Sequence, residues 1–114
     1  MKTPKIYISG KISGMEEQAR KLFFEAQKTL EQAGFEAINP MALNHDHDKS
    51  WESFMKEDLK ALLECDAIYL LPNWKKSPGA IIEYFLAVQL SMPVYKNLFD
   101  AIEIFNHTAF TPRV

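Results

Sequence analysis

The chain has 114 residues, of which 47% are hydrophobic and 25% are charged, and its formal net charge is -2. This length suits one domain over residues 1–114, and the charge excludes a strongly basic nucleic-acid surface or a polyanionic tail. Cys65 is the only cysteine, so an internal disulfide and a thiolate metal cluster are excluded. The start of the chain lacks an apolar run suited to a signal peptide or membrane span, so we expect a cytoplasmic protein without nucleic-acid or membrane partners.

The first half of the chain reads as strand, helix, strand and helix. "KIYISG" predicts a first strand, and a helix should follow over about 15–33, ended by Gly34. One face of that helix carries Ala19, Leu22, Phe23, Ala26, Leu30 and Ala33. "FEAINP" predicts a second strand, and residues 41–50 a loop. Asp48 or Ser50 could cap the next helix, which runs to about residue 64.

The second half repeats this alternation. "DAIYLLP" is almost wholly apolar, which is typical of a central strand buried on both faces. Ser77 and Pro78 predict a helix start, with a hydroxyl cap before a first-turn proline, and the helix should reach about residue 91. "MPVYKN" predicts a short strand and "LFDAIEIFNH" a last helix. The pattern predicts a single-domain three-layer α/β/α fold, Rossmann-like or flavodoxin-like, with a parallel sheet of four to five strands.

In such sheets ligands bind beyond the carboxyl ends of the strands, so loops 10–14, 40–50 and 72–79 should surround the site. Glu83 follows the third loop and is the only charged side chain between Lys76 and Lys96. An isolated carboxylate is costly to bury unless it is paired or faces a wet cleft. Glu83 therefore marks either a functional group or the solvent-facing stripe of its helix.

Asp58 is a second carboxylate in an unexpected place. It lies within the apolar stripe of its helix, which consists of Trp51, Phe54, Met55, Leu59, Leu62 and Leu63. It could occupy an edge or make a structural hydrogen bond. Alternatively, two carboxylates in one cleft are the minimal equipment for breaking a glycosidic bond.

Three motifs, "KIYISGKISG", "MKEDLKALLECDAIYLL" and "SPGAIIE", resemble the nucleoside 2-deoxyribosyltransferase superfamily. The nearest members are the small deoxynucleoside monophosphate N-glycosidases and a bacterial and phage family related to them. The resemblance covers about residues 5–94. It implies that Glu83 is the nucleophile that attacks the anomeric carbon, that Tyr7 orients it, and that Asp58 acts near the base and leaving group. It also implies that Ser77 and Gly79 meet the sugar or its phosphate and that Gly10 allows close backbone approach.

Two positions depart from the pattern of this superfamily. Ser77 replaces the acid of the transferases that act on free nucleosides, and Lys11 replaces a small residue of the monophosphate hydrolases. A hydroxyl beside unpaired N–H groups at a helix N-terminus suits a phosphate, and Lys11 could add a cationic contact or remain a solvated lysine.

"HDHD" at residues 45–48 fits a polar loop better than a metal site, because no third ligand is evident. We expect no metal and no cofactor. Trp74 could stack on a base or belong to a surface loop.

The resemblance implies an enzyme that cleaves or transfers the N-glycosidic bond of a nucleoside or nucleoside 5′-monophosphate. The alternative is a non-catalytic nucleotide-binding sensor or regulatory module. The apolar helix over residues 80–90 also predicts a homodimer or larger homo-oligomer.

Overall fold

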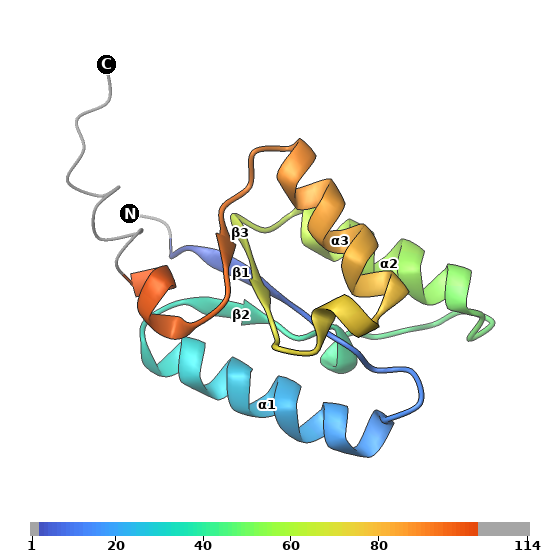
Figure 1. The fold of residues 1–114 in the computed structure, drawn as a ribbon. Coiled ribbons are helices and arrows are strands. Elements are labelled where there is room, and N and C mark those ends of the chain that lie inside the picture. Colours follow the sequence, from blue (N-terminus) through green and yellow to red (C-terminus); the bar gives the residue numbers. More distant parts are fainter. Residues whose placement is uncertain (1–2, 103–114) are drawn as a thin grey trace.

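The computed structural model describes residues 3–102, which form one parallel sheet with helices on both faces (Figure 1). The elements are β1 (Lys5–Ser9), α1 (Glu16–Gln32), β2 (Glu36–Ile38), the 3-10 turn η1 (Pro40–Ala42), α2 (Trp51–Leu63), β3 (Ala67–Leu70), the 3-10 turn η2 (Trp74–Lys76), α3 (Pro78–Gln89) and β4 (Val94–Tyr95). A further helical stretch covers residues 98–102, and the rest of the predicted last helix lies outside the described residues.

The strand order is β2-β1-β3-β4, and every pairing is parallel. β1 therefore lies inside the sheet, and Tyr7 pairs with Ile68 while Ser9 pairs with Leu70 of β3. Parallel strands need crossover connections, and here these are supplied by helices, as the alternating pattern predicts. The predicted fold class, an α/β fold with a parallel sheet flanked by helices, is confirmed.

The sheet separates two hydrophobic layers. One contains Ile6 and Ile8 of β1 with Phe23 of α1, and the other contains Tyr7 of β1 with Leu62 of α2. Figure 1 shows α1 on one side of the sheet and α2 with α3 on the other. Successive strand residues point to opposite faces, so Tyr7 and Ser9 both point toward α2 and α3. This geometry delivers two hydroxyl groups to the side of the sheet that carries Glu83.

The helix boundaries lie close to their predicted positions because local signals set them. Ser50 and Ser77 accept hydrogen bonds from the third backbone amide of α2 and α3, as expected of N-caps. Gly34 has φ 96°, which lets it end α1 in the left-handed conformation.

The predicted buried faces are only partly correct. Leu22, Trp51 and Leu63 are 37%, 46% and 55% exposed, so the buried face of α1 and of α2 is narrower than its apolar stripe. Residues 40–42, at the start of the predicted loop, form the turn η1, in which the Asn39 side chain accepts the Met41 amide. Within residues 3–102, no helix combines the length and apolar character that a membrane crossing requires.

Candidate active site

A pocket of about 430 Å³ opens at the carboxyl end of the sheet. All three predicted loops contribute to its wall, together with the first half of α2 and the start of α3. Its lining residues include Gly10, Ile12, Ser13, Pro40, Met41, His45, Lys49 and Ser77 from the loops, Trp51, Phe54, Met55 and Asp58 from α2, and Gly79 from the first turn of α3. Tyr7 and Glu83 also line it, so the structure brings both anomalous carboxylates and the tyrosine of β1 to one cavity.

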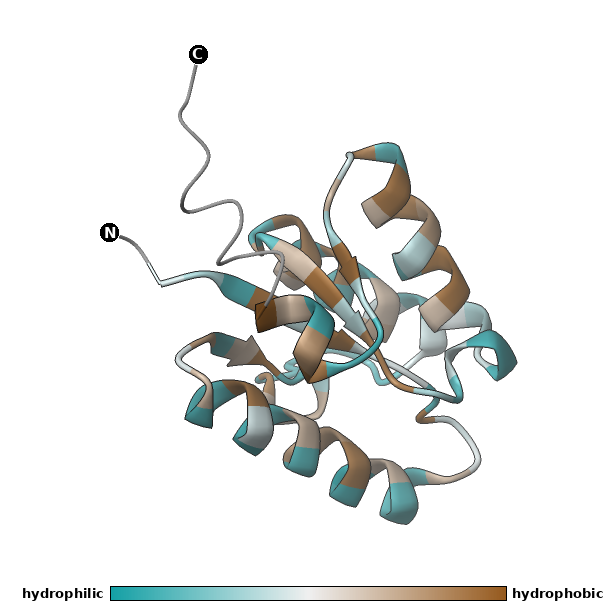
Figure 2. Cartoon of the chain, turned by 60° about the vertical axis from the view of Figure 1, so that its left-hand side comes forward, coloured by the Kyte–Doolittle hydropathy of each residue, from teal (hydrophilic) through white to brown (hydrophobic). Residues whose placement is uncertain are grey.

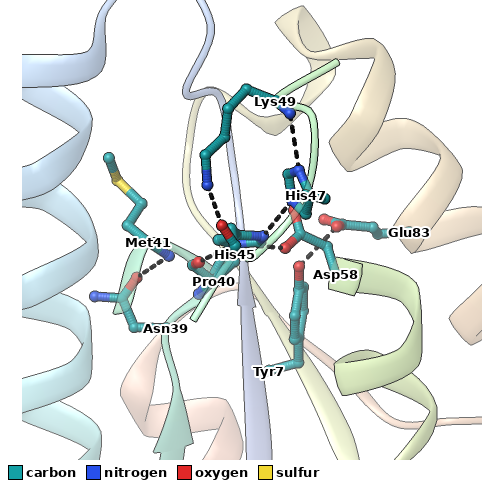
Figure 3. Close-up of polar contacts among 9 residues, drawn as sticks. All are labelled: Tyr7, Asn39, Pro40, Met41, His45, His47, Lys49, Asp58 and Glu83. Atoms are coloured by element: carbon teal, nitrogen blue, oxygen red, sulfur yellow. Dashed lines mark hydrogen bonds and ion pairs between the residues drawn. The ribbon is translucent and has the colours of Figure 1, made fainter. Parts of the chain in front are cut away.

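Glu83 is held by two hydroxyl groups from β1. It is 4% exposed, which excludes the solvent-facing alternative. The Tyr7 hydroxyl donates to Glu83 Oε2 at 2.7 Å, and the Ser9 hydroxyl donates to Oε1 at 2.6 Å. Both hydrogen bonds are buried, and each carboxylate oxygen has one hydroxyl donor. Figure 3 shows the contact between Tyr7 and Glu83, and Glu83 lines the pocket.

Burial raises the pKa of Glu83 to about 7, and the negative charge of Asp58 adds to the rise. The hydrogen bonds from Ser9 and Tyr7 act in the opposite direction, because they favour the ionised carboxylate. The pKa of Tyr7 is raised well above its usual value, first by burial and then by Glu83. Tyr7 therefore remains a hydrogen-bond donor at any physiological pH.

Asp58 reaches the same pocket from α2 and is 8% exposed. Burial raises its pKa to about 7, and the neighbouring Glu57 carboxylate adds to the shift. Its Oδ1 atom is buried and has no hydrogen-bond partner among the described residues. The imidazole of His45 lies beside it, with Nε2 3.6 Å from Oδ1, beyond hydrogen-bonding distance.

The N-terminus of α3 forms another part of the wall. Pro78 has no N–H, Ala80 donates its amide to Ser77 Oγ at 3.1 Å, and Ile81 donates to the Ser77 carbonyl at 3.0 Å. Among the described contacts, the Gly79 N–H is thus the first-turn donor that remains available to a ligand. The sequence suggested that several unpaired N–H groups would be available there. A Cβ at Gly79 would lie 2.9 Å from Met55 Sδ, so α2 packs closely against this turn.

Gly10 and Lys11 follow β1. A Cβ at Gly10 would lie 2.8 Å from Leu71 Cδ1, so close packing against the end of β3 requires glycine there. The Lys11 amide donates to Asn73 Oδ1 at 3.1 Å, and its Nζ donates to the Lys76 carbonyl at 3.3 Å. Lys11 therefore lies beside the loop that leads into Ser77. Its neighbours in the sequence, Gly10 and Ile12, both line the pocket.

Ser9 and His45 are parts of this site that the sequence analysis did not identify. The two-residue period of a strand would have placed Ser9 on the same face as Tyr7, so a signal for it existed. His45 stood in the sequence only as part of a loop motif, because its contacts with Asp58 and Phe54 form when the loop packs on α2. Trp74, by contrast, packs on Tyr84 with ring centroids 4.6 Å apart. Within residues 3–102 no group of three His, Cys, Asp or Glu side chains could hold a metal ion.

The fold is similar to those of two solved enzymes. The 2-deoxyribosyltransferase of Bacillus psychrosaccharolyticus superposes with a TM-score of 0.63 at 23% identity, covering 79% of this chain and 69% of that one. The CMP N-glycosidase BcmB of Clostridium botulinum superposes with a TM-score of 0.56 at 26% identity, and the match covers 79% of this chain but 65% of the glycosidase. The structural similarity to these enzymes confirms the resemblance suggested by the sequence motifs.

No curated protein matches the chain in sequence. A family match covers most of the described residues, from the start of β1 to the end of β4, and includes every predicted site residue. The chain belongs to the family described as "Domain of unknown function (DUF4406)", which it matches over residues 4–96.

Proposed function

We propose that the chain cleaves or transfers the N-glycosidic bond of a nucleoside or nucleoside 5′-monophosphate, with Glu83 as the nucleophile. The observation that carries this proposal is the Glu83 carboxylate, buried, held by the Tyr7 and Ser9 hydroxyls, and facing the same pocket as Asp58. The similarity of the fold to a 2-deoxyribosyltransferase and a CMP N-glycosidase supports the same reaction class.

The different surroundings of the two acids support different roles for them in the proposed reaction. Glu83 receives two hydroxyl hydrogen bonds, which favour its ionised form, whereas no hydroxyl or amide hydrogen bond to Asp58 is found among the described residues. At a pH near 7 the reactive species would hold Glu83 as the carboxylate and Asp58 as the acid. A pair of carboxyl groups divided in this way is suited to a two-step displacement at a sugar carbon.

In the first step a Glu83 oxygen bonds to the anomeric carbon while the bond from that carbon to the base nitrogen breaks. The electron pair of the broken bond goes to the base, which takes the proton from Asp58. In the second step water attacks the anomeric carbon, the ester bond to Glu83 breaks, and Asp58 takes the proton from water. If a second base attacks in place of water, the product is a new nucleoside rather than a free sugar.

The proposal is tested by incubating the protein with a panel of ribo- and deoxyribonucleosides and their 5′-monophosphates. Free base, separated by chromatography, is the expected product, and adding a second base distinguishes transfer from hydrolysis. Thermal stabilisation by a nucleotide without release of base would instead indicate a binding module that senses nucleotides.

We expect monophosphates to bind more tightly than the matching nucleosides. The Gly79 N–H, the Ser77 hydroxyl and the positive end of the α3 dipole would meet the phosphate, with Lys11 nearby. Charge-assisted hydrogen bonds contribute about 1.5–3 kcal/mol each before desolvation losses. The measurement is the pair of dissociation constants, nucleoside against monophosphate, for the wild type and for Ser77→Asp, in which repulsion should reverse the preference. Equal constants in the wild type would contradict a phosphate subsite.

Ser9→Ala should shift the acidic limb of the kcat/KM profile to higher pH by about one to two units. The variant loses one of the two hydrogen bonds that stabilise the Glu83 carboxylate, and a bond to a charged group is worth about 1.5–3 kcal/mol. Thr29→Ala is the matched control, since it removes a hydroxyl on the outer surface of α1 that bonds only the Glu25 carbonyl among the described contacts. A uniform loss of activity with an unchanged limb would mean that Ser9 has only a packing role.

We also expect a homodimer or larger assembly that uses the outward face of α3. Within the described chain this face leaves large apolar side chains open to solvent, namely Ile81, Ile82, Phe85, Val88 and Leu90. Hydrophobic residues run along most of α3, whereas they alternate with hydrophilic ones along α1 (Figure 2). Light scattering should give a mass above that of one chain, and Phe85→Lys, at a side chain 63% exposed, should lower it. A monomer at high concentration would contradict this expectation.

A further inference from the structure

The loop between η1 and α2 contains a chain of hydrogen bonds that runs through two histidine rings (Figure 3). The Lys49 backbone N–H donates to His47 Nδ1 at 3.0 Å. His47 Nε2 lies 3.0 Å from His45 Nδ1, and His45 Nε2 lies 3.0 Å from the Pro40 carbonyl. The chain ends beside the acid of the pocket, because His45 Nε2 also lies 3.6 Å from Asp58 Oδ1.

The two ends of this chain determine where every ring proton lies. A backbone N–H can only donate, so His47 Nδ1 must accept, and a neutral His47 then carries its proton on Nε2. That proton is donated to His45 Nδ1, which places the His45 proton on Nε2. The Pro40 carbonyl can only accept, so it agrees with this direction. A second proton on His45 would face the His47 N–H, so the intact chain requires both rings to be neutral.

Packing holds both rings in this arrangement. His45 and His47 pack on Phe54 of α2, with ring centroids 4.8 and 4.6 Å apart. Lys49 has φ 65°, a left-handed conformation that is costly for a lysine, and its Nζ donates to the His45 carbonyl. A strained residue that supplies the first donor of the chain indicates that the loop is built around these rings.

The fixed direction of the His45 N–H determines which oxygen of Asp58 carries a proton. Its Oδ1 is buried, and the group that faces it is the N–H edge of His45 rather than a lone pair. Other charged or titratable groups near Asp58 are Glu57 on its own helix and Tyr7 and Glu83 across the pocket. An N–H edge next to Oδ1 disfavours a proton on that oxygen, so a neutral Asp58 should carry its proton on Oδ2.

From this geometry we infer that His45, oriented by His47, is a positioning residue for the acid of the proposed reaction. His45 keeps the Asp58 proton on Oδ2, from which it is passed to the leaving base when the glycosidic nitrogen–carbon bond breaks. Both histidines remain neutral throughout, and neither touches the reacting atoms. This inference rests on the proposed function for its chemistry, but the hydrogen-bond chain can be tested without any substrate.

The substrate-free test is to record long-range proton–nitrogen NMR spectra of the uniformly ¹⁵N-labelled protein, with His107→Gln to assign the third histidine. We expect His45 and His47 each to show a single tautomer with the proton on Nε2. In His47→Phe, which keeps an aromatic ring against Phe54, His45 Nδ1 loses its donor, so its nitrogen resonance should shift toward that of an unbonded lone pair, while the Pro40 carbonyl still holds the proton on Nε2. A proton on Nδ1 of either ring, or tautomer exchange in the wild type, would overturn the inference.

The kinetic test compares a nucleotide substrate identified by the panel with the 4-nitrophenyl deoxyriboside 5′-phosphate, whose leaving group needs little protonation. His45→Ala should lower kcat/KM for the nucleotide by about tenfold or more, a part of the 10²–10⁴ that a positioned acid supplies. His45→Ala should leave kcat/KM for the nitrophenyl substrate nearly unchanged. His45→Gln, which keeps an N–H donor, should recover part of the kcat/KM lost with the nucleotide.

Asp46→Asn is the control variant, because this exposed side chain lies between the two histidines in the sequence. Asp46→Asn should leave kcat/KM unchanged for both substrates. An equal loss on both substrates in His45→Ala would mean that the histidine only supports the loop, and would overturn the positioning role. If the wild type releases no base from any substrate, the proposed function fails, while the tautomer measurement still decides whether the chain of hydrogen bonds exists.

Discussion

Glu83→Gln is expected to lower kcat/KM for base release by about 10³-fold or more. The amide has nearly the shape of the carboxylate, and its oxygen can still accept a hydrogen bond from Tyr7 or Ser9. It cannot, however, form the ester with the anomeric carbon. The loss should therefore appear in kcat, and the dissociation constant for a nucleotide should change much less. The measurement is chromatographic base release at saturating substrate, with a thermal shift assay for binding.

Glu64→Gln is the matched control for this substitution. It makes the same chemical change at an exposed position just after α2, outside the pocket. It should retain wild-type turnover. Base release by Glu83→Gln at the wild-type rate would exclude Glu83 as the nucleophile and, with it, the proposed two-step displacement.

The second large effect concerns stability and its dependence on pH. The folded-state pKa of Glu83 is about 7 against 4.5 for a free glutamate, and that of Asp58 is about 7 against 3.8. Because both values are raised, the folded chain binds more protons than the unfolded chain between these pH values. The stability contribution of protonation is therefore complete below about pH 4 and is lost as the pH rises through about 7. The free energy of unfolding should fall between pH 4 and pH 8.

The size of the change in the free energy of unfolding follows from the pKa shift. For Glu83, a rise from 4.5 to about 7 corresponds to about 3 kcal/mol for an isolated group. Glu83→Gln removes this ionisation, so the variant should be more stable than the wild type at pH 8 and nearly equal to it at pH 4. Urea unfolding at the two pH values measures the difference, with Glu64→Gln as the control. Wild-type stability that is flat or rises over this range would show that the two acids are not buried as described.

The two predictions describe one physical compromise. A carboxylate taken out of water destabilises the fold, and the same burial gives Glu83 and Asp58 the pKa values that acid–base work near pH 7 requires. One substitution should therefore abolish activity and raise stability. That combination would not be expected of a residue with only a structural role.

The sequence by itself determined the fold class, because its signals are local. The apolar period of 3.6 residues, the continuous apolar strand before Pro72, and the Ser77-Pro78 helix start each depend on neighbouring residues in the chain. It also marked Glu83 and Asp58, because a lone charge in an apolar stripe is visible without coordinates. The topology rule for parallel sheets then placed the pocket beside the correct three loops.

The tertiary structure decided which groups meet. Ser9 is 74 positions from Glu83, and the bond between them exists because β1 lies inside the sheet and α3 crosses over it. The sequence likewise could not show that Pro78 and Ser77 leave mainly the Gly79 amide for a ligand, or that Lys11 bonds to the Lys76 carbonyl. His45 lies beside Asp58 in a loop whose two histidine rings pack on Phe54 of α2, a contact that the sequence does not show. Periodicity reports which side of an element is apolar, whereas the direction and partner of each polar group depend on how the elements pack together.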